Sequence, residues 1–321
     1  MNAWFIFVFL TVLLWGMTGL IYKTGIHKGE EKYICLKYSI SAGVVFFVIV
    51  LFYLYTRNEP FSIWESAVRF WPMTVFGIVY FVINTISFNG YIYNEIIVES
   101  PIEGISGGTS VVLLISVYLV MGRVDSLREL FTPLRTIGIL IIIFSIILLS
   151  FVRNRENADD STRNAQKRSW KRRGLGTLIF PVMFAMVDAI ETVVTGVCLD
   201  TTYGYSMPEG DSIIIVGAEY FIMAFGCWIY ISVKEKKAYN PLRRENLPRL
   251  IGSVTDNVGV VFYSYAMAID SISTDPVLAI YPIVAMIGGC VFLKEKVSKI
   301  QFVTAAFIVL GSVLVAADIA I

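Results

Sequence analysis

The chain has 321 residues, of which 56% are hydrophobic and only 16% are charged, and its formal net charge is +1. Soluble globular domains carry about 25% charged residues, so this composition excludes an ordinary soluble fold. The four cysteines and the single histidine, His27, form neither a CxxC motif nor a Cys/His cluster. We therefore expect no metal site, no disulfide framework and no cofactor.

Ten apolar segments occupy most of the chain, and each is close to the length that spans a bilayer. The first segment has no basic residue before it and no clear cleavage site after it, so it is interpreted as a retained transmembrane helix. The fold class expected is an all-α integral membrane protein. The predicted segments are 2–22, 35–55, 70–93, 98–121, 134–152, 175–199, 211–233, 249–269, 274–293 and 300–319.

The ten segments divide into two sets of five, residues 1–152 and 175–321, joined by the polar linker 153–174. Weak internal similarity favours a duplication, because Pro101 and Pro276 begin matching stretches at nearly the same offset that separates two aromatic motifs upstream. After five spans the chain is on the opposite face of the membrane from where it began. The second half therefore starts on that face, and homologous halves must be inverted relative to each other. Inverted repeats around a central cavity are the usual architecture of secondary transporters.

Lysine and arginine are distributed unevenly between the two faces that these spans define. The positive-inside rule places the more basic face, including the linker 153–174, in the cytoplasm, and both termini and the loop 200–210 outside. We expect an integral protein of a bacterial plasma membrane, as a monomer or homodimer. The basic linker is explained by anionic lipid head groups, so no nucleic-acid partner is expected. Only five basic residues fall on the outer face: Arg57, Arg69, Arg123, Arg128 and Arg135.

The expected outer face is acidic. Its carboxylates come from the loops and helix ends on that side of the membrane. They are Asp200, Glu209, Asp211, Asp270 and Asp275.

Several short motifs resemble the drug/metabolite transporter superfamily, and specifically the EamA-like permeases. They are Leu14-Trp15-Gly16, the stretch Ala279–Ile287, the hairpin Phe292-Leu-Lys-Glu-Lys-Val and the following apolar stretch Phe307–Val315. The similarity is strongest over 273–316, and the first-half counterpart of the hairpin, Gly122–Asp125, departs from the pattern. The resemblance implies a ten-helix transporter with a central cavity lined by helices 1–4 and 6–9, and with helices 5 and 10 at the periphery.

Carboxylates inside the spans are the main functional candidates, because ionisable groups are costly in a membrane and usually mark a pathway. Asp188 and Glu191 are three residues apart in one segment and share a helix face. Two such carboxylates cannot both ionise easily at low dielectric, which suits a proton-coupled carrier. The alternative for each is a misplaced span boundary or a carboxyl that is hydrogen bonded to a neighbouring helix. Glu219 is central in segment 211–233, and no lysine or arginine lies comparably deep.

Other candidates follow from helical spacing. Asp256 and Tyr263 share a face of segment 249–269, and Asn84 and Tyr91 follow the same spacing in segment 70–93, so these faces are expected to oppose each other across the cavity. Glu103 begins a predicted helix and could instead be an N-terminal dipole partner.

Two aromatic residues, Trp15 and Tyr281, lie on the helices that the resemblance identifies as cavity walls. The alternative for both is ordinary packing between helices. Small-residue runs at 104–110 and 288–290 are typical of helices that approach each other closely.

These features predict a secondary transporter that moves a small organic solute, such as an amine, an amino acid or a similar cationic or zwitterionic compound. Transport by alternating access with protons as the coupling ion is expected. One alternative is a membrane sensor or assembly protein without transport activity, which would have a sealed core. The other is an integral-membrane enzyme, which is disfavoured because the only histidine is in a loop and the acidic groups lie at mid-depth.

Overall fold

The computed structural model shows a bundle of helices, and no strand occurs in the part of the chain that it describes. The all-helical class predicted from the sequence is therefore confirmed. The described residues are 3–24, 33–58, 60–87, 105–124, 132–156, 176–278, 280–292, 294 and 299–320.

Each of the ten predicted segments overlaps one or two described helices. The helices of the first half are α1 (Ala3–Thr24), α2 (Ile34–Thr56), α3 (Ile63–Arg69), α4 (Trp71–Ser87), α7 (Ile105–Val120) and α9 (Pro133–Glu156). Those of the second half are α11 (Gly176–Leu199), α12 (Glu209–Glu235), the 3-10 turn Arg244–Asn246, α13 (Leu247–Ile269), α14 (Ser271–Leu278), α15 (Tyr281–Phe292) and α16 (Lys299–Ala320).

Within the described residues, five helical segments are long and apolar enough to cross a membrane: α1, α2, residues 182–199 of α11, α12, and α14 together with α15. The count rises to six if α3 and α4, which meet at a 94° bend, form one broken span. Helix α13 does not belong to this group, because one of its faces carries buried polar residues, among them Arg249, Ser253 and Asn257.

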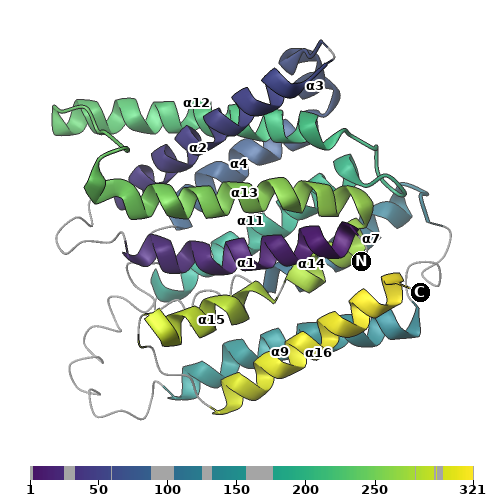
Figure 1. Ribbon diagram of the computed structural model, residues 1–321. Coiled ribbons are helices and arrows are strands. Elements are labelled where there is room, and N and C mark those ends of the chain that lie inside the picture. The colour runs from purple at the N-terminus through teal and green to yellow at the C-terminus, as the bar shows by residue number, and fades with distance from the viewer. Residues whose placement is uncertain are drawn as a thin grey trace.

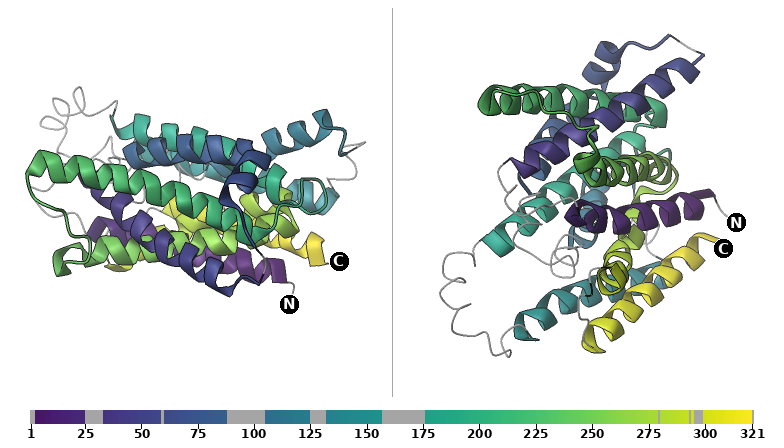
Figure 2. Two further views of the ribbon diagram at one scale, coloured as in Figure 1. Left: turned by 90° about the horizontal axis from the view of Figure 1, so that it is seen from above. Right: turned by 60° about the vertical axis from the view of Figure 1, so that its left-hand side comes forward.

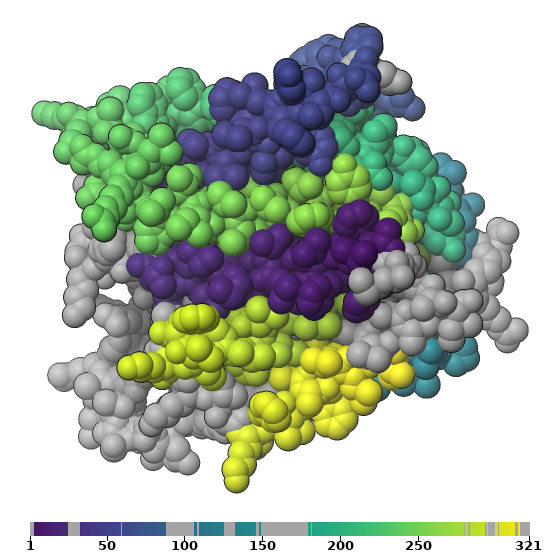
Figure 3. All heavy atoms as spheres, in the orientation of Figure 1, coloured from purple at the N-terminus to yellow at the C-terminus, as the bar shows by residue number. Residues whose placement is uncertain are grey.

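The helices pack in a regular order (Figures 1 and 2). Helix α12 runs along α2, α13 along α1, and α11 against both α4 and α7. Helices α9 and α16 pack along each other at the lower edge of the bundle in Figure 1. In the space-filling view α1 crosses the middle of the visible face, between α13 and α15 (Figure 3). Helix α1 begins and α16 ends at the same end of the bundle.

Glycine allows the closest of these helix contacts. A methyl group at Gly43 of α2 would overlap Ala224 of α12, and one at Gly288 of α15 would overlap Leu20 of α1. The small-residue run at 288–290 therefore brings α15 against α1, as expected for membrane helices.

Two ion pairs join the halves at the end of the bundle where α1 begins. Arg57 contacts Asp211 at 2.5 Å, and Arg135 contacts Asp270 at 3.2 Å. These two aspartates of the expected acidic face are largely buried, each against an arginine from the other half.

A buried arginine lies at the beginning of α13. Arg249 has no exposed surface; it donates to Asn246 Oδ1 at 2.5 Å and lies over the Tyr38 ring. No basic residue was expected deep in the protein, because Arg249 stands at the boundary of its predicted span.

Candidate functional site

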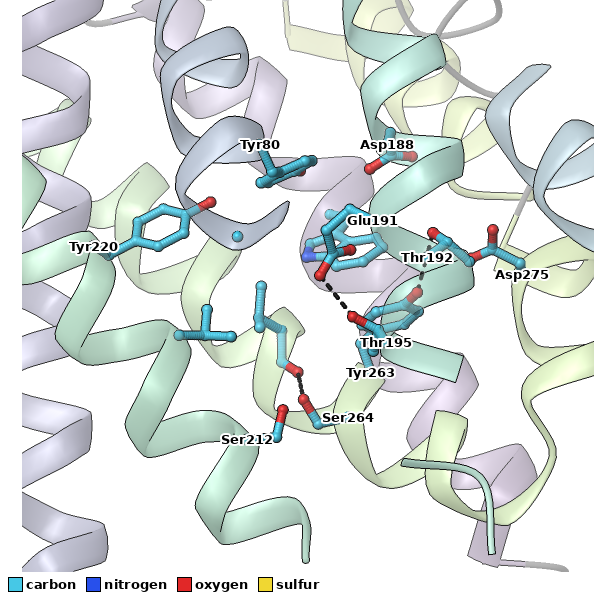
Figure 4. A pocket seen from close by; sticks show the side chains of 14 residues that line it. Tyr80, Asp188, Glu191, Thr192, Thr195, Ser212, Tyr220, Tyr263, Ser264 and Asp275 are labelled. Carbon is cyan, nitrogen blue, oxygen red and sulfur yellow. Dashed lines mark hydrogen bonds between the residues drawn. The ribbon is translucent and has the colours of Figure 1, made fainter. Parts of the chain in front are cut away.

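A small cavity lies between α1, α4, α11, α12, α13 and α14, and Figure 4 shows the side chains that line it. Its volume is about 60 Å³, enough for a few water molecules and too small for an organic solute. Helices α9 and α16 contribute no residue to the described lining. Three of the lining residues are carboxylates, Asp188, Glu191 and Asp275.

Helix α11 supplies the polar stripe of the cavity. Asp188 and Glu191 share its inner face, as the spacing predicted, and Thr192 and Thr195 extend that face. Each carboxylate has its own hydroxyl donor: Thr195 Oγ1 donates to Glu191 at 2.6 Å, and Ser106 Oγ donates to Asp188 at 2.7 Å. Each hydroxyl group satisfies part of the hydrogen-bonding capacity of its carboxylate but leaves the negative charge in place. Both carboxylates therefore remain able to bind a cation.

Asp275 is the third carboxylate, and its expected place on the outer face is wrong. It is 7% exposed, and Ser110 Oγ of α7 donates to it at 2.5 Å. Asp275 also interacts electrostatically with Glu191. The short helix α14, which ends close to a break at Ile280, carries Asp275 inwards. The matching prolines 101 and 276 were the one sequence signal that could have indicated this position.

Aromatic residues form the opposite part of the wall. The indole Nε1 of Trp15 donates to the Asp256 carbonyl oxygen at 3.1 Å, and its ring centroid lies 5.2 Å from that of Tyr263. The Tyr263 hydroxyl donates to Thr192 Oγ1 at 3.2 Å. A methyl group at Gly259 would overlap the indole, so α13 accommodates Trp15 only because it has glycine there.

Four of the expected site residues line the cavity: Trp15, Asp188, Glu191 and Tyr263. Tyr281 lies behind Trp15, with its ring edge-on at 6.4 Å. Tyr91 and Glu103 lie outside the described residues.

Three further expected residues are close to the cavity but absent from its described lining: Asn84, Glu219 and Asp256. Asn84 lies within hydrogen-bonding reach of the Tyr220 hydroxyl on α12. Helix α4 contributes Gly77 and Tyr80 to the wall in its place, so the expected face is displaced towards the beginning of the helix.

The Arg135–Asp270 pair predicts a pH dependence of stability. Burial raises the pKa of the Asp270 carboxyl, and the Arg135 guanidinium opposes that rise without cancelling it. The folded protein therefore holds a proton there more tightly than the unfolded chain, whose aspartate pKa is ~3.9. The stability contributed by this proton is complete below that value and is lost as pH rises through the raised pKa.

The variant Asp270→Asn removes this titration. The unsubstituted protein is expected to lose stability relative to the variant as pH rises across the same window. Melting temperatures of both proteins in detergent, over a pH series, measure the difference. A difference that stays constant with pH contradicts the expectation.

Comparisons with known proteins bear on both halves of the chain. The model of the EamA-like transporter family matches residues 179–317. No curated protein matches the chain. A solved structure, titled only as the crystal structure of a protein, shares the fold with a TM-score of 0.60 at 13% identity, over 98% of this chain and 97% of the other. The second half of this chain, with the α11, α13 and α14 residues of the cavity, therefore matches the EamA-like transporter family, as the sequence resemblance predicted.

Proposed function

We propose that this protein is a secondary transporter that moves a small cationic or zwitterionic organic solute across a membrane by alternating access. The observation that carries this proposal is the cavity with three carboxylates, Asp188, Glu191 and Asp275, enclosed by helices from both halves.

The chemistry of the cavity wall favours a positively charged group. Carboxylates attract cations, and so do the faces of the Trp15 and Tyr263 rings. No lysine or arginine occurs among the described lining residues. A phosphorylated or otherwise anionic solute would meet only like charge there, at a cost that low dielectric increases.

The size of the cavity supports a cycle of opening and closing. At about 60 Å³ it cannot hold a solute with these walls in place, so binding requires the helices to separate. The wall is shared between α1 and α4 of the first half and α11 to α14 of the second. The ion pairs Arg57–Asp211 and Arg135–Asp270 hold the halves together at one end, so they would break when that end opens.

The packing order supports two inverted five-helix repeats, residues 1–152 and 175–321. In such repeats α1 corresponds to α11, α4 to α13, and α7 to α14 and α15. The contact between α1 and α13 then corresponds to that between α11 and α4, and the contact between α1 and α15 to that between α11 and α7. The pairs α2–α12 and α9–α16 are formed by helices that occupy the same position in the two halves. We further propose that both termini face outwards, that the linker 153–174 is cytoplasmic, and that the protein works as a monomer or homodimer in a bacterial plasma membrane.

A thermal-shift screen of the purified protein tests the solute class. Amines, amino acids, purines and nucleotide sugars are added in acidic and in neutral buffer, because a ligand that binds only the folded state raises the melting temperature. A cationic or zwitterionic solute is expected to stabilise the protein. Glu191→Gln, which keeps the shape and removes the charge, is expected to abolish that shift. Glu235→Gln, at an exposed glutamate at the end of α12, is the matched control and should retain it.

Two results would contradict the proposal. Stabilisation by anionic solutes alone would show that the carboxylates do not define the solute. A purified protein that binds none of these compounds and exchanges none across liposomes would favour the non-transporting sensor.

A further inference from the structure

Glu219 differs from the cavity carboxylates because it has no hydrogen-bond partner among the residues that the structure describes. It lies on α12, is 8% exposed, and neither oxygen of its carboxyl accepts a hydrogen bond from any described residue. By contrast, Asp188, Glu191 and Asp275 each accept one from a hydroxyl. A buried ionised carboxyl without donors is strongly unfavourable, whereas its neutral, protonated form is tolerated.

The position of Glu219 connects it to the cavity without exposing it there. Its carboxyl occupies the space beside Gly77, where a side chain on α4 would otherwise lie, and Gly77 is part of the cavity wall. Glu219 also interacts electrostatically with Glu191, which lines the cavity. A change in the charge of Glu219 therefore changes the electrostatic energy of Glu191, which lines the cavity.

The titratable groups around Glu219 are acidic or phenolic. Helix α11 contributes Glu191, and Tyr220 beside Glu219 interacts in turn with Asp256 of α13. Helix α4 contributes Tyr80, which lines the cavity and interacts with Tyr220.

The cations of α2 are engaged at its two ends. Arg57 pairs with Asp211, and Lys37 lies over the Tyr239 ring. No cation of a described residue therefore compensates the charge of Glu219.

A proton fits this place better than a metal ion does. Sodium-like and larger cations require several oxygen ligands, and calcium takes six to eight. No group of three or more acidic, cysteine or histidine residues within the described ranges could hold a metal ion. A proton needs only one carboxyl oxygen.

We propose that Glu219 carries the coupling proton of the transport cycle, at a site behind the cavity wall that is separate from the carboxylates that bind the solute. The proposal rests on the proposed transport function. The step is a proton exchange alone: the carboxyl O–H bond breaks, the proton passes to water that enters when α4 and α12 separate, and the carboxylate is reprotonated from the other side. Because Glu219 and Glu191 interact, the occupancy of the cavity and the proton on Glu219 are linked.

The first experiment needs no solute. Infrared spectra of the purified protein at neutral pH report the carbonyl band of protonated carboxyl groups, and Glu219→Gln is expected to remove part of this band. Glu235→Gln, at an exposed glutamate of the same helix, should leave the band unchanged. An unchanged band in Glu219→Gln would overturn the proposal, because Glu219 would then carry no proton.

The second experiment separates the proton from the solute, using whichever cationic solute stabilises the protein in the thermal-shift screen. In proteoliposomes, Glu219→Gln is expected to retain solute binding and solute–solute exchange, but to lose accumulation driven by a pH gradient. Retained gradient-driven accumulation would overturn the proposal. Loss of binding would also overturn it, because Glu219 would then be a solute-binding carboxylate.

The two proposals fail in different ways. If the unsubstituted protein binds and exchanges no solute, the transport function fails, while the infrared result still decides whether Glu219 is protonated. If binding and exchange occur but the band is unaffected, only the assignment of the proton to Glu219 fails.

Discussion

Asp200→Ala is expected to destabilise the protein more than any other single carboxyl substitution outside the cavity, by about 4 kcal/mol. Asp200 is 1% exposed and follows α11 directly. Its Oδ1 accepts the backbone N–H groups of Thr202 and Tyr203 at 2.8 Å each. Its Oδ2 accepts the backbone N–H of Ser271 at 3.1 Å and the Ser271 hydroxyl at 2.5 Å.

The size of this effect follows from what the substitution leaves behind. Alanine removes one acceptor group and leaves four donors unsatisfied, and each buried orphan costs about 1–3 kcal/mol. The loop after α11 would also lose its connection to the beginning of α14. Thermal melting in detergent, or chemical denaturation, measures the loss.

The matched control is Glu209→Ala, which removes a half-buried carboxylate from the first turn of α12, at the same end of the bundle. Its expected cost is about 0.3–1 kcal/mol, from the lost interaction with the helix dipole. If the two variants melt alike, the hydrogen bonds of Asp200 do not contribute to stability as described.

Asp275→Asn is expected to weaken binding of a cationic solute by about 10–100-fold, since a hydrogen bond to a charged group is worth about 1.5–3 kcal/mol. Asparagine keeps the shape and one acceptor oxygen, so Ser110 can still donate and the fold should be preserved. The loss therefore reports the charge of Asp275 rather than its packing. Ligand titrations followed by thermal shift measure the affinity.

Ser110→Ala provides the comparison. It removes the donor to Asp275 and leaves the negative charge in place, so its effect on affinity is expected to be tenfold or less. If Asp275→Asn binds the solute as tightly as the unsubstituted protein, Asp275 is a structural carboxyl, and the positive group of the solute contacts Asp188 and Glu191 alone.

The sequence by itself determined where the helices are and which residues share a face within one helix. Apolar runs of bilayer length predicted the regions of the long described helices, because a helix satisfies its own backbone hydrogen bonds inside lipid. They missed the short helix α3, which lies between two of the predicted segments. The stripe of Asp188 and Glu191 on α11 followed from local periodicity, which needs no knowledge of a partner helix. The motifs in residues 279–315 similarly indicated the family whose model matches residues 179–317.

Only the tertiary structure decided which residues of other helices contact each of these helix faces. Asp275 looked like a residue of the outer surface, because its neighbours in sequence are polar, and its burial depends on Ser110 from the other half of the chain. Glu219 and Asp188 are both carboxylates near the middle of apolar helices. Ser106 donates a hydrogen bond to Asp188, whereas Glu219 lies beside Gly77 and accepts no hydrogen bond from a described residue. Such differences arise from contacts between residues far apart in sequence, so the periodicity of a single helix cannot reveal them.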